Sequence, residues 1–257
     1  YGSDAVRYWA ASGRLGVDVT FDPAQLKVGR RLAIKILNAS RFVLSLAPPG
    51  DLPPGPPAAA VSEPLDAAML GRLAEVIEAC TRSFESYDHA GALAAAEDFF
   101  WFFCDDYLEL VKGRAYGERG GGPAGSARAA LRLALSVMLR LLAPFLPYVT
   151  EEVWSWSQEG SVHRSAWPGP ADALAPAPGV GAGALHAASA AIAAVRGAKS
   201  GARASMRTPV RDLVVAARQD HLDALTAVLP DIEAAGRVEH TELRLSDEPE
   251  PVYQVTL

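Results

Sequence analysis

The sequence predicts a mainly α fold, in which an antiparallel helical bundle is followed by a small α+β domain. Apolar residues recur at helical spacing in long segments of the first two thirds of the chain. Beyond a stretch rich in Pro, Ala and Gly, short alternating runs typical of strands appear. The chain has 257 residues, enough to bury two cores. We therefore expect a helical-bundle domain over residues 1–168, a linker over 169–183 and an α+β domain over 184–257.

The elements of the bundle follow from apolar stripes and from helix-breaking residues. A proline-rich segment over 47–64 predicts a stiff loop, and Ser126 is the expected N-cap of the helix that follows a glycine-rich turn. Pro144 and Pro147 are expected to end that helix. After an opening helix, the predicted helices cover residues 29–44, 66–87, 92–114, 126–142 and 150–156.

The smaller domain is predicted to alternate helices and strands. An Ala-rich helix over 185–198 precedes a short buried strand over 212–217. A helical stripe from Leu222 to Ile232 is expected to bend at Pro230. Residues 237–245 and 252–257 alternate apolar and polar side chains, which predicts two further strands.

The helix predicted over 29–44 has two distinct faces. Leu32, Ile36, Ala39 and Val43 form an apolar stripe, and a second stripe carries donor groups and one aromatic ring. Such a face can neutralise phosphates and stack on an unpaired base. The alternative is a solvated basic face with the aromatic ring in the core. The second stripe consists of Arg31, Lys35, Asn38 and Phe42.

A second basic stretch contains Arg196, Lys199, Arg203 and Arg207. In a helix, these spacings of three and four would place all four cations on one face. Because two glycines and a proline lie nearby, the segment is alternatively a basic loop, and a purely solvated face is the third possibility. The net charge of −6 excludes general electrostatic attraction to nucleic acid, but it leaves room for such local basic surfaces.

Several blocks of the sequence resemble one family in their wording and order. They include Asn38-Ala39-Ser40-Arg41-Phe42, the segment from Phe99 to Lys112 that begins with an aromatic run, the segment from Leu141 to Trp154, and Ser161-Val162-His163. From Tyr1 to Pro168, the chain resembles the class I aminoacyl-tRNA synthetases of the valine, isoleucine and leucine group, and most closely the valyl members. The matched region is the one that follows the catalytic core in that family.

The resemblance implies a tRNA-binding role for this bundle. In the family, the bundle packs along the anticodon arm and holds unstacked anticodon bases. It implies that Phe42 stacks on an anticodon base, with Lys35, Asn38, Arg41 and Arg31 as its polar neighbours. Phosphates of the tRNA backbone are the expected partners of Arg196, Lys199, Arg203 and Arg207.

No catalytic constellation is found in the sequence. The two nucleotide-site signatures of the family do not occur, so we expect no catalytic residue and no cofactor in this chain. ATP and Mg²⁺ would belong to the parent enzyme. Asp98, Asp105 and Glu109 share a helix face, but a solvated acidic face is a better interpretation than a metal site.

The expected function is recognition of the anticodon arm of tRNA(Val), as the C-terminal part of a valine–tRNA ligase. Its expected partners are this tRNA and the catalytic domain of the same polypeptide, with no DNA and no membrane. Two cysteines without metal-ligand spacing and the lack of a secretory signal predict a cytoplasmic protein. The alternatives are the same region of an isoleucyl enzyme and a stand-alone, non-catalytic interaction module.

Overall fold

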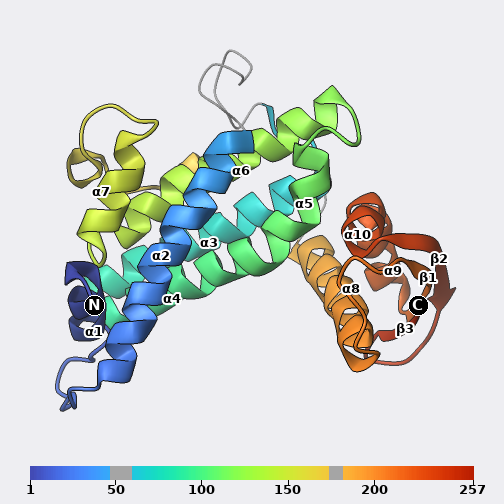
Figure 1. Cartoon of the computed structure of the whole chain (residues 1–257), viewed down its shortest axis with the longest axis horizontal. Helices are drawn as coiled ribbons and strands as arrows, with labels where there is room; N and C mark the ends of the chain where they lie inside the picture. The colour runs from blue at the N-terminus through green and yellow to red at the C-terminus, as the bar shows by residue number, and fades with distance from the viewer. Residues whose placement is uncertain (47–59, 174–181) are drawn as a thin grey trace. The chain divides into compact units, whose positions relative to one another are not determined.

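A computed structural model of the protein describes residues 1–46, 60–173 and 182–257 (Figure 1). Most of the proline-rich loop and part of the predicted linker therefore lie outside the described residues. The chain forms two compact units. The first unit contains Tyr1–Ala60, Leu70–Phe103 and Arg128–Ala175, and the second contains Val61–Met69, Cys104–Ala127 and Pro176–Leu257. The predicted domain boundary at 169–183 stays a prediction.

The first unit is helical, and its elements pack through small and apolar side chains. At Gly29, an added Cβ would lie 2.7 Å from the Cβ of Tyr8, so only glycine allows this close approach between the first two helices. The carboxylate of Asp4 accepts hydrogen bonds from the amides of Tyr148 and Val149, at 3.1 and 2.8 Å. The unit contains α1 (Ser3–Ala11), α2 (Pro23–Leu46), α4 (His89–Phe102) and α7 (Pro147–Ser155), with most of α3 (Pro64–Glu85) and α6 (Gly121–Leu142).

The second unit combines helices with a mixed three-stranded sheet of order β2-β1-β3. The central strand β1 pairs in parallel with β2 and antiparallel with β3. Val215 of β1 lies opposite Leu243 and Tyr253, so these apolar residues share one face of the sheet. The unit contains α5 (Leu108–Ala115), α8 (Ala182–Gly201), β1 (Val210–Ala217), α9 (Gln219–Thr226), α10 (Leu229–Gly236), β2 (Val238–Leu245) and β3 (Val252–Thr256).

The mainly α fold with a small α+β part is confirmed, but three elements differ from expectation. The helix predicted over 92–114 is interrupted by a π-helical turn at Phe103–Tyr107. The stripe ending at Ile232 is divided into α9 and α10, because Pro230 starts a new helix instead of bending one. Ser126 lies inside α6 and is not its N-cap, since α6 begins at Gly121.

Candidate nucleic-acid interface

The candidate site is built on α2, whose sequence forms a helix for identifiable reasons. Asp22 accepts a hydrogen bond from the amide of Ala24 at 2.8 Å, and Pro23 occupies the first helical position. The predicted apolar stripe is confirmed as core, since all four of its members are buried. Leu32 and Val43 are both 0 % exposed, so the side of α2 that carries them faces the core of the first unit. The opposite face of α2 is therefore presented to solvent.

Each member of the second predicted stripe of α2 directly precedes a member of the buried stripe, so these residues lie together on a face that is rotated from the buried stripe by about 100°. Arg31, Asn38 and Arg41 are exposed, while Lys35 and Phe42 are half-buried. Phe42 is therefore not fully buried, which is a condition for stacking on a base. Arg41 follows Asn38 by three residues and lies at the margin of the face.

Trp101, at the end of α4, lies beneath two of these cations. The guanidinium carbon of Arg31 is 5.6 Å from the centre of the Trp101 ring, and Nζ of Lys35 is 5.7 Å from it. Such cation–π contacts orient the two charges without neutralising them. Helical periodicity does not predict that Trp101 belongs to the site, although Trp101 lies in the aromatic run that begins at Phe99.

Glu97 fixes the position of this tryptophan. Its carboxylate accepts hydrogen bonds from Nε1 of Trp101 at 3.1 Å and from the hydroxyl of Tyr8 at 2.8 Å. Burial, together with the hydrogen bond to Glu97, raises the pKa of the Tyr8 hydroxyl well above its ordinary value. The Tyr8 hydroxyl therefore remains a neutral hydrogen-bond donor. The Glu97 carboxylate accepts from both Tyr8 and Trp101, and this fixes the indole ring relative to α1.

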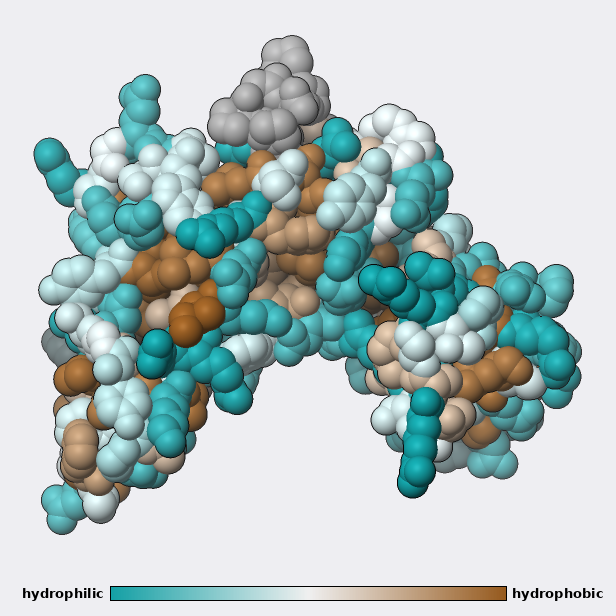
Figure 2. Space-filling model, in the orientation of Figure 1, coloured by the Kyte–Doolittle hydropathy of each residue, from teal (hydrophilic) through white to brown (hydrophobic). Residues whose placement is uncertain are grey.

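A second tryptophan supports the predicted site at Arg41. The guanidinium carbon of Arg41 lies 5.5 Å from the centre of the Trp156 ring, and Nε1 of Trp156 donates to Glu152 at 3.1 Å. The face of α2 thus combines cations, an amide and an aromatic ring, which is the chemistry that holds phosphates and unstacked bases. In the view of Figure 2, hydrophilic and hydrophobic surface alternate where Figure 1 draws α2.

The second predicted basic surface does not form as one helix face. Helix α8 ends at Gly201, and Arg203 adopts a left-handed conformation with φ of 53°. Lys199 is only 2 % exposed, and its ammonium donates to the carbonyl oxygens of Met206 at 3.1 Å and Gly236 at 2.8 Å. The helical alternative, with all four cations on one exposed face, is therefore wrong.

The three arginines of this stretch have different surroundings. Arg196 is half-buried and forms an ion pair of 3.0 Å with Asp106. Arg203 and Arg207 are exposed in the turns that follow α8. A role for these arginines in binding phosphate stays a prediction, whereas the burial of Lys199 favours a structural role for that residue.

Replacing Lys199 by methionine is expected to destabilise the second unit. Two carbonyl oxygens would lose their shared donor, at a cost of about 1–3 kcal/mol, measured as a lower midpoint of urea unfolding. The matched variant Arg203→Gly removes one charge at a left-handed position that glycine adopts freely, so it should leave the midpoint unchanged or raise it. A methionine variant as stable as the unmodified chain would contradict the structural role.

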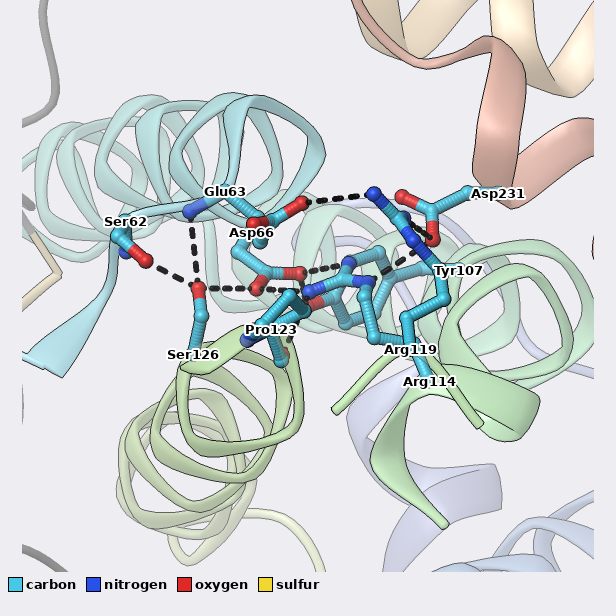
Figure 3. A network of polar contacts seen from close by, with 9 residues as sticks. All are labelled: Ser62, Glu63, Asp66, Tyr107, Arg114, Arg119, Pro123, Ser126 and Asp231. Carbon is cyan, nitrogen blue, oxygen red and sulfur yellow. Dashed lines mark hydrogen bonds and ion pairs between the residues drawn. The ribbon is translucent and has the colours of Figure 1, made fainter. Parts of the chain in front are cut away.

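A buried polar network in the second unit was not predicted from the sequence (Figure 3). Arg114 is 1 % exposed, and its two Nη atoms donate to the two oxygens of Asp66, each at 2.7 Å. Its Nε donates to Asp231 at 2.8 Å. Asp66 also accepts from Tyr107 at 2.7 Å and from Ser126 at 2.6 Å.

This network joins α10 to the beginnings of α3 and α6. Ser126 accepts hydrogen bonds from the amides of Ser62 and Glu63, each at 3.0 Å, so it satisfies the start of α3. Burial raises the pKa of Asp231, and Arg114 is the strongest opposing influence on that pKa. The sequence contained one signal for this network, since Arg114 continues the apolar stripe of Tyr107 and Leu110 at helical spacing.

Among the described residues, no group of three His, Cys, Asp or Glu side chains could hold a metal ion. In the same ranges, no helix is both long enough and apolar enough to cross a membrane. Both cysteines, Cys80 and Cys104, are buried free thiols. Burial raises the pKa of Cys80 to about 11, so its thiol is protonated at neutral pH.

Comparison with known proteins adds the family. The anticodon-binding domain of tRNA ligase matches residues 66–215, which is more than half of the chain. The chain is 51% identical to the valine–tRNA ligase of Salinispora tropica, covering 97% of this chain and 30% of that protein. It is 53% identical to the enzyme of Thermobifida fusca, covering 100% of this chain and 28% of that protein.

These alignments contain α2, which precedes the matched domain range. The solved structure of an Agrobacterium radiobacter LeuRS–tRNA complex matches 100% of this chain and 29% of its own chain. The TM-score is 0.44 at 14% sequence identity, so this match adds nothing to the assignment. The chain spans about 30% of the length of the valine–tRNA ligases it matches. It belongs to the family of anticodon-binding domains of tRNA ligases, and the relatives that it matches over almost its whole length are valine–tRNA ligases.

Proposed function

We propose that this chain recognises the anticodon arm of tRNA(Val) within a cytoplasmic valine–tRNA ligase. The observation that carries the proposal is the polar face of α2, which is formed by Arg31, Lys35, Asn38 and Phe42 in a chain about half identical to valine–tRNA ligases. The cations bind phosphates, and Asn38 and Phe42 contact a splayed-out base. ATP and Mg²⁺ serve the catalytic domain of the same polypeptide.

Arg31 and Lys35 have a defined orientation for this task. Because both lie over Trp101, their side chains retain fewer rotamers than free surface cations, so less conformational entropy is lost when RNA binds. Arg41 is held similarly over Trp156. The face is thus ordered before the ligand arrives.

The exposed arginines of the second unit contribute a separate, sequence-independent attraction. Arg203 and Arg207 lie in a segment without acidic residues, and they contact backbone phosphates together with Arg196. Lys199 holds the adjoining turn and the end of α10 by its two hydrogen bonds.

A gel-shift titration tests the proposal. The chain is titrated against three transcripts of the same tRNA body, which carry a valine, an isoleucine or a scrambled anticodon. We expect the tightest binding with the valine anticodon. Equal affinity for all three would overturn anticodon reading, tightest binding with the isoleucine anticodon would transfer the proposal to isoleucine tRNA, and no binding would overturn the tRNA-binding role itself.

A further inference from the structure

A groove lies beside the N-terminal half of α2 and shares only Arg31 with the site already described. It has a volume of about 660 Å³ and is lined by Tyr1, Lys27, Arg30, Arg31 and Ile34. An adjoining groove of about 460 Å³ shares Tyr1, Arg30 and Ile34 and continues to Leu37 and Tyr148. All of these residues belong to the first unit. We refer to the part lined by Lys27, Arg30 and Arg31 as the α2 groove.

The side chains that give the α2 groove its charge are cations without an ion-pair partner. Its three cations are exposed, and no carboxylate among the described residues forms an ion pair with any of them. Helix α2 as a whole carries five cations and no acidic residue. This concentration of positive charge in a chain of net charge −6 favours an anionic ligand.

Two acidic residues, Asp4 and Glu152, line the adjoining groove and accept hydrogen bonds from other groups. Asp4 accepts from the amides of Tyr148 and Val149, and Glu152 accepts from Nε1 of Trp156. Asp22 accepts from the amide of Ala24. Among the described residues, none of these carboxylates forms an ion pair with Lys27, Arg30 or Arg31, so the three cations remain available to a ligand.

The α2 groove is continuous with the proposed anticodon face, because Arg31 belongs to both. From Lys27 to Arg41 the helix rises about 21 Å, at 1.5 Å per residue, which is long enough to follow several consecutive phosphates of one strand. Tyr1 and Ile34, with exposed fractions of 55% and 46%, give the groove an apolar wall. A ribose or a base can pack against such a wall while its phosphate contacts the cations.

We propose that Lys27 and Arg30 bind backbone phosphates of the RNA strand that continues from the proposed anticodon face, without reading its sequence. This inference rests on the proposed function and extends the contact along α2 toward its N-terminus. The ligand is the phosphodiester backbone of the bound tRNA.

The test compares two double variants that lose the same charge. Lys27→Ala with Arg30→Ala removes the two groove cations, and Arg82→Ala with Arg211→Ala removes two exposed arginines that pair with Glu78 and Asp212. Filter binding is measured with valine-anticodon and scrambled-anticodon tRNA over a range of KCl concentrations. The groove variant should flatten the slope of log affinity against log salt by about 1.4–1.8, from 0.7–0.9 for each lost phosphate contact.

The flattening should be the same for both tRNAs, because phosphates carry no sequence information, and the control variant should retain the original slope. An unchanged slope in the groove variant, or an equal change in the control, would overturn this inference alone. A loss confined to the valine anticodon would mean that the groove reads bases, which also overturns it. If the unmodified chain binds no tRNA, the proposed function fails together with this inference.

Discussion

Arg114→Met is expected to lower the free energy of unfolding of the second unit by about 3–5 kcal/mol, as measured for broken buried ion pairs. The side chain is 1 % exposed and holds the carboxylates of Asp66 and Asp231 through three charge-assisted hydrogen bonds. Without the guanidinium, both carboxylates remain buried with fewer donors. Urea unfolding followed by far-UV circular dichroism, with amide exchange of β1 as a local probe, measures the loss.

The cost of Arg114→Met should decrease as the pH is lowered from 7 toward 5. Burial already raises the pKa of Asp231, and removing Arg114 takes away the strongest influence that lowers it. The folded variant then binds more protons than the unfolded chain in this range, so its stability rises as the pH falls. A loss that does not change with pH would show that lost packing, and not the unpaired carboxylate, dominates.

Arg119→Met is the matched control for this prediction. Arg119 contacts the same Asp231 at 2.9 Å, but its side chain is 30% exposed. A partly solvated pair contributes about 0–1 kcal/mol, so the control should unfold close to the unmodified chain. If both variants lose the same stability, burial is not what makes the Arg114 network strong.

Phe42→Leu is expected to weaken binding of tRNA(Val) by roughly 5- to 150-fold, which corresponds to about 1–3 kcal/mol for one lost base stack. Leucine retains an apolar side chain on the half-buried side of Phe42 but has no ring face. The folded fraction should therefore change little. Fluorescence anisotropy with labelled tRNA, corrected for the folded fraction, gives the affinity.

Phe42→Tyr supplies the control, because it retains the ring and should bind within a few-fold of the unmodified chain. If Phe42→Leu lowers the melting temperature sharply while the affinity of the folded protein is unchanged, Phe42 is a core residue. If both variants lose affinity equally, the position is sensitive to any change in shape and stacking is not its role.

Much of the candidate site could be predicted from local sequence. The spacing of Leu32, Ile36 and Val43 determined which side of α2 is buried, and this placed Arg31 and Asn38 in solvent. Trp101 could not be assigned in the same way. Its contact with Arg31 joins residues 70 positions apart, and helical periodicity says nothing about which turn of one helix meets which turn of another.

The sequence alone determined the helical character of the first two thirds of the chain, the alternation of the strands and the polar face of α2. Each of these depends on a period of 3.6 or 2 residues, which is local information. Only the tertiary structure decided that Lys199 and Arg114 are buried. Both side chains continue apolar stripes of their helices. A charged group at such a buried position is stable only where carbonyl or carboxylate oxygens from distant parts of the chain accept its hydrogen bonds. The partners include Asp231 and Gly236 of α10 and Asp66 of α3, and a sequence pattern cannot place these helices.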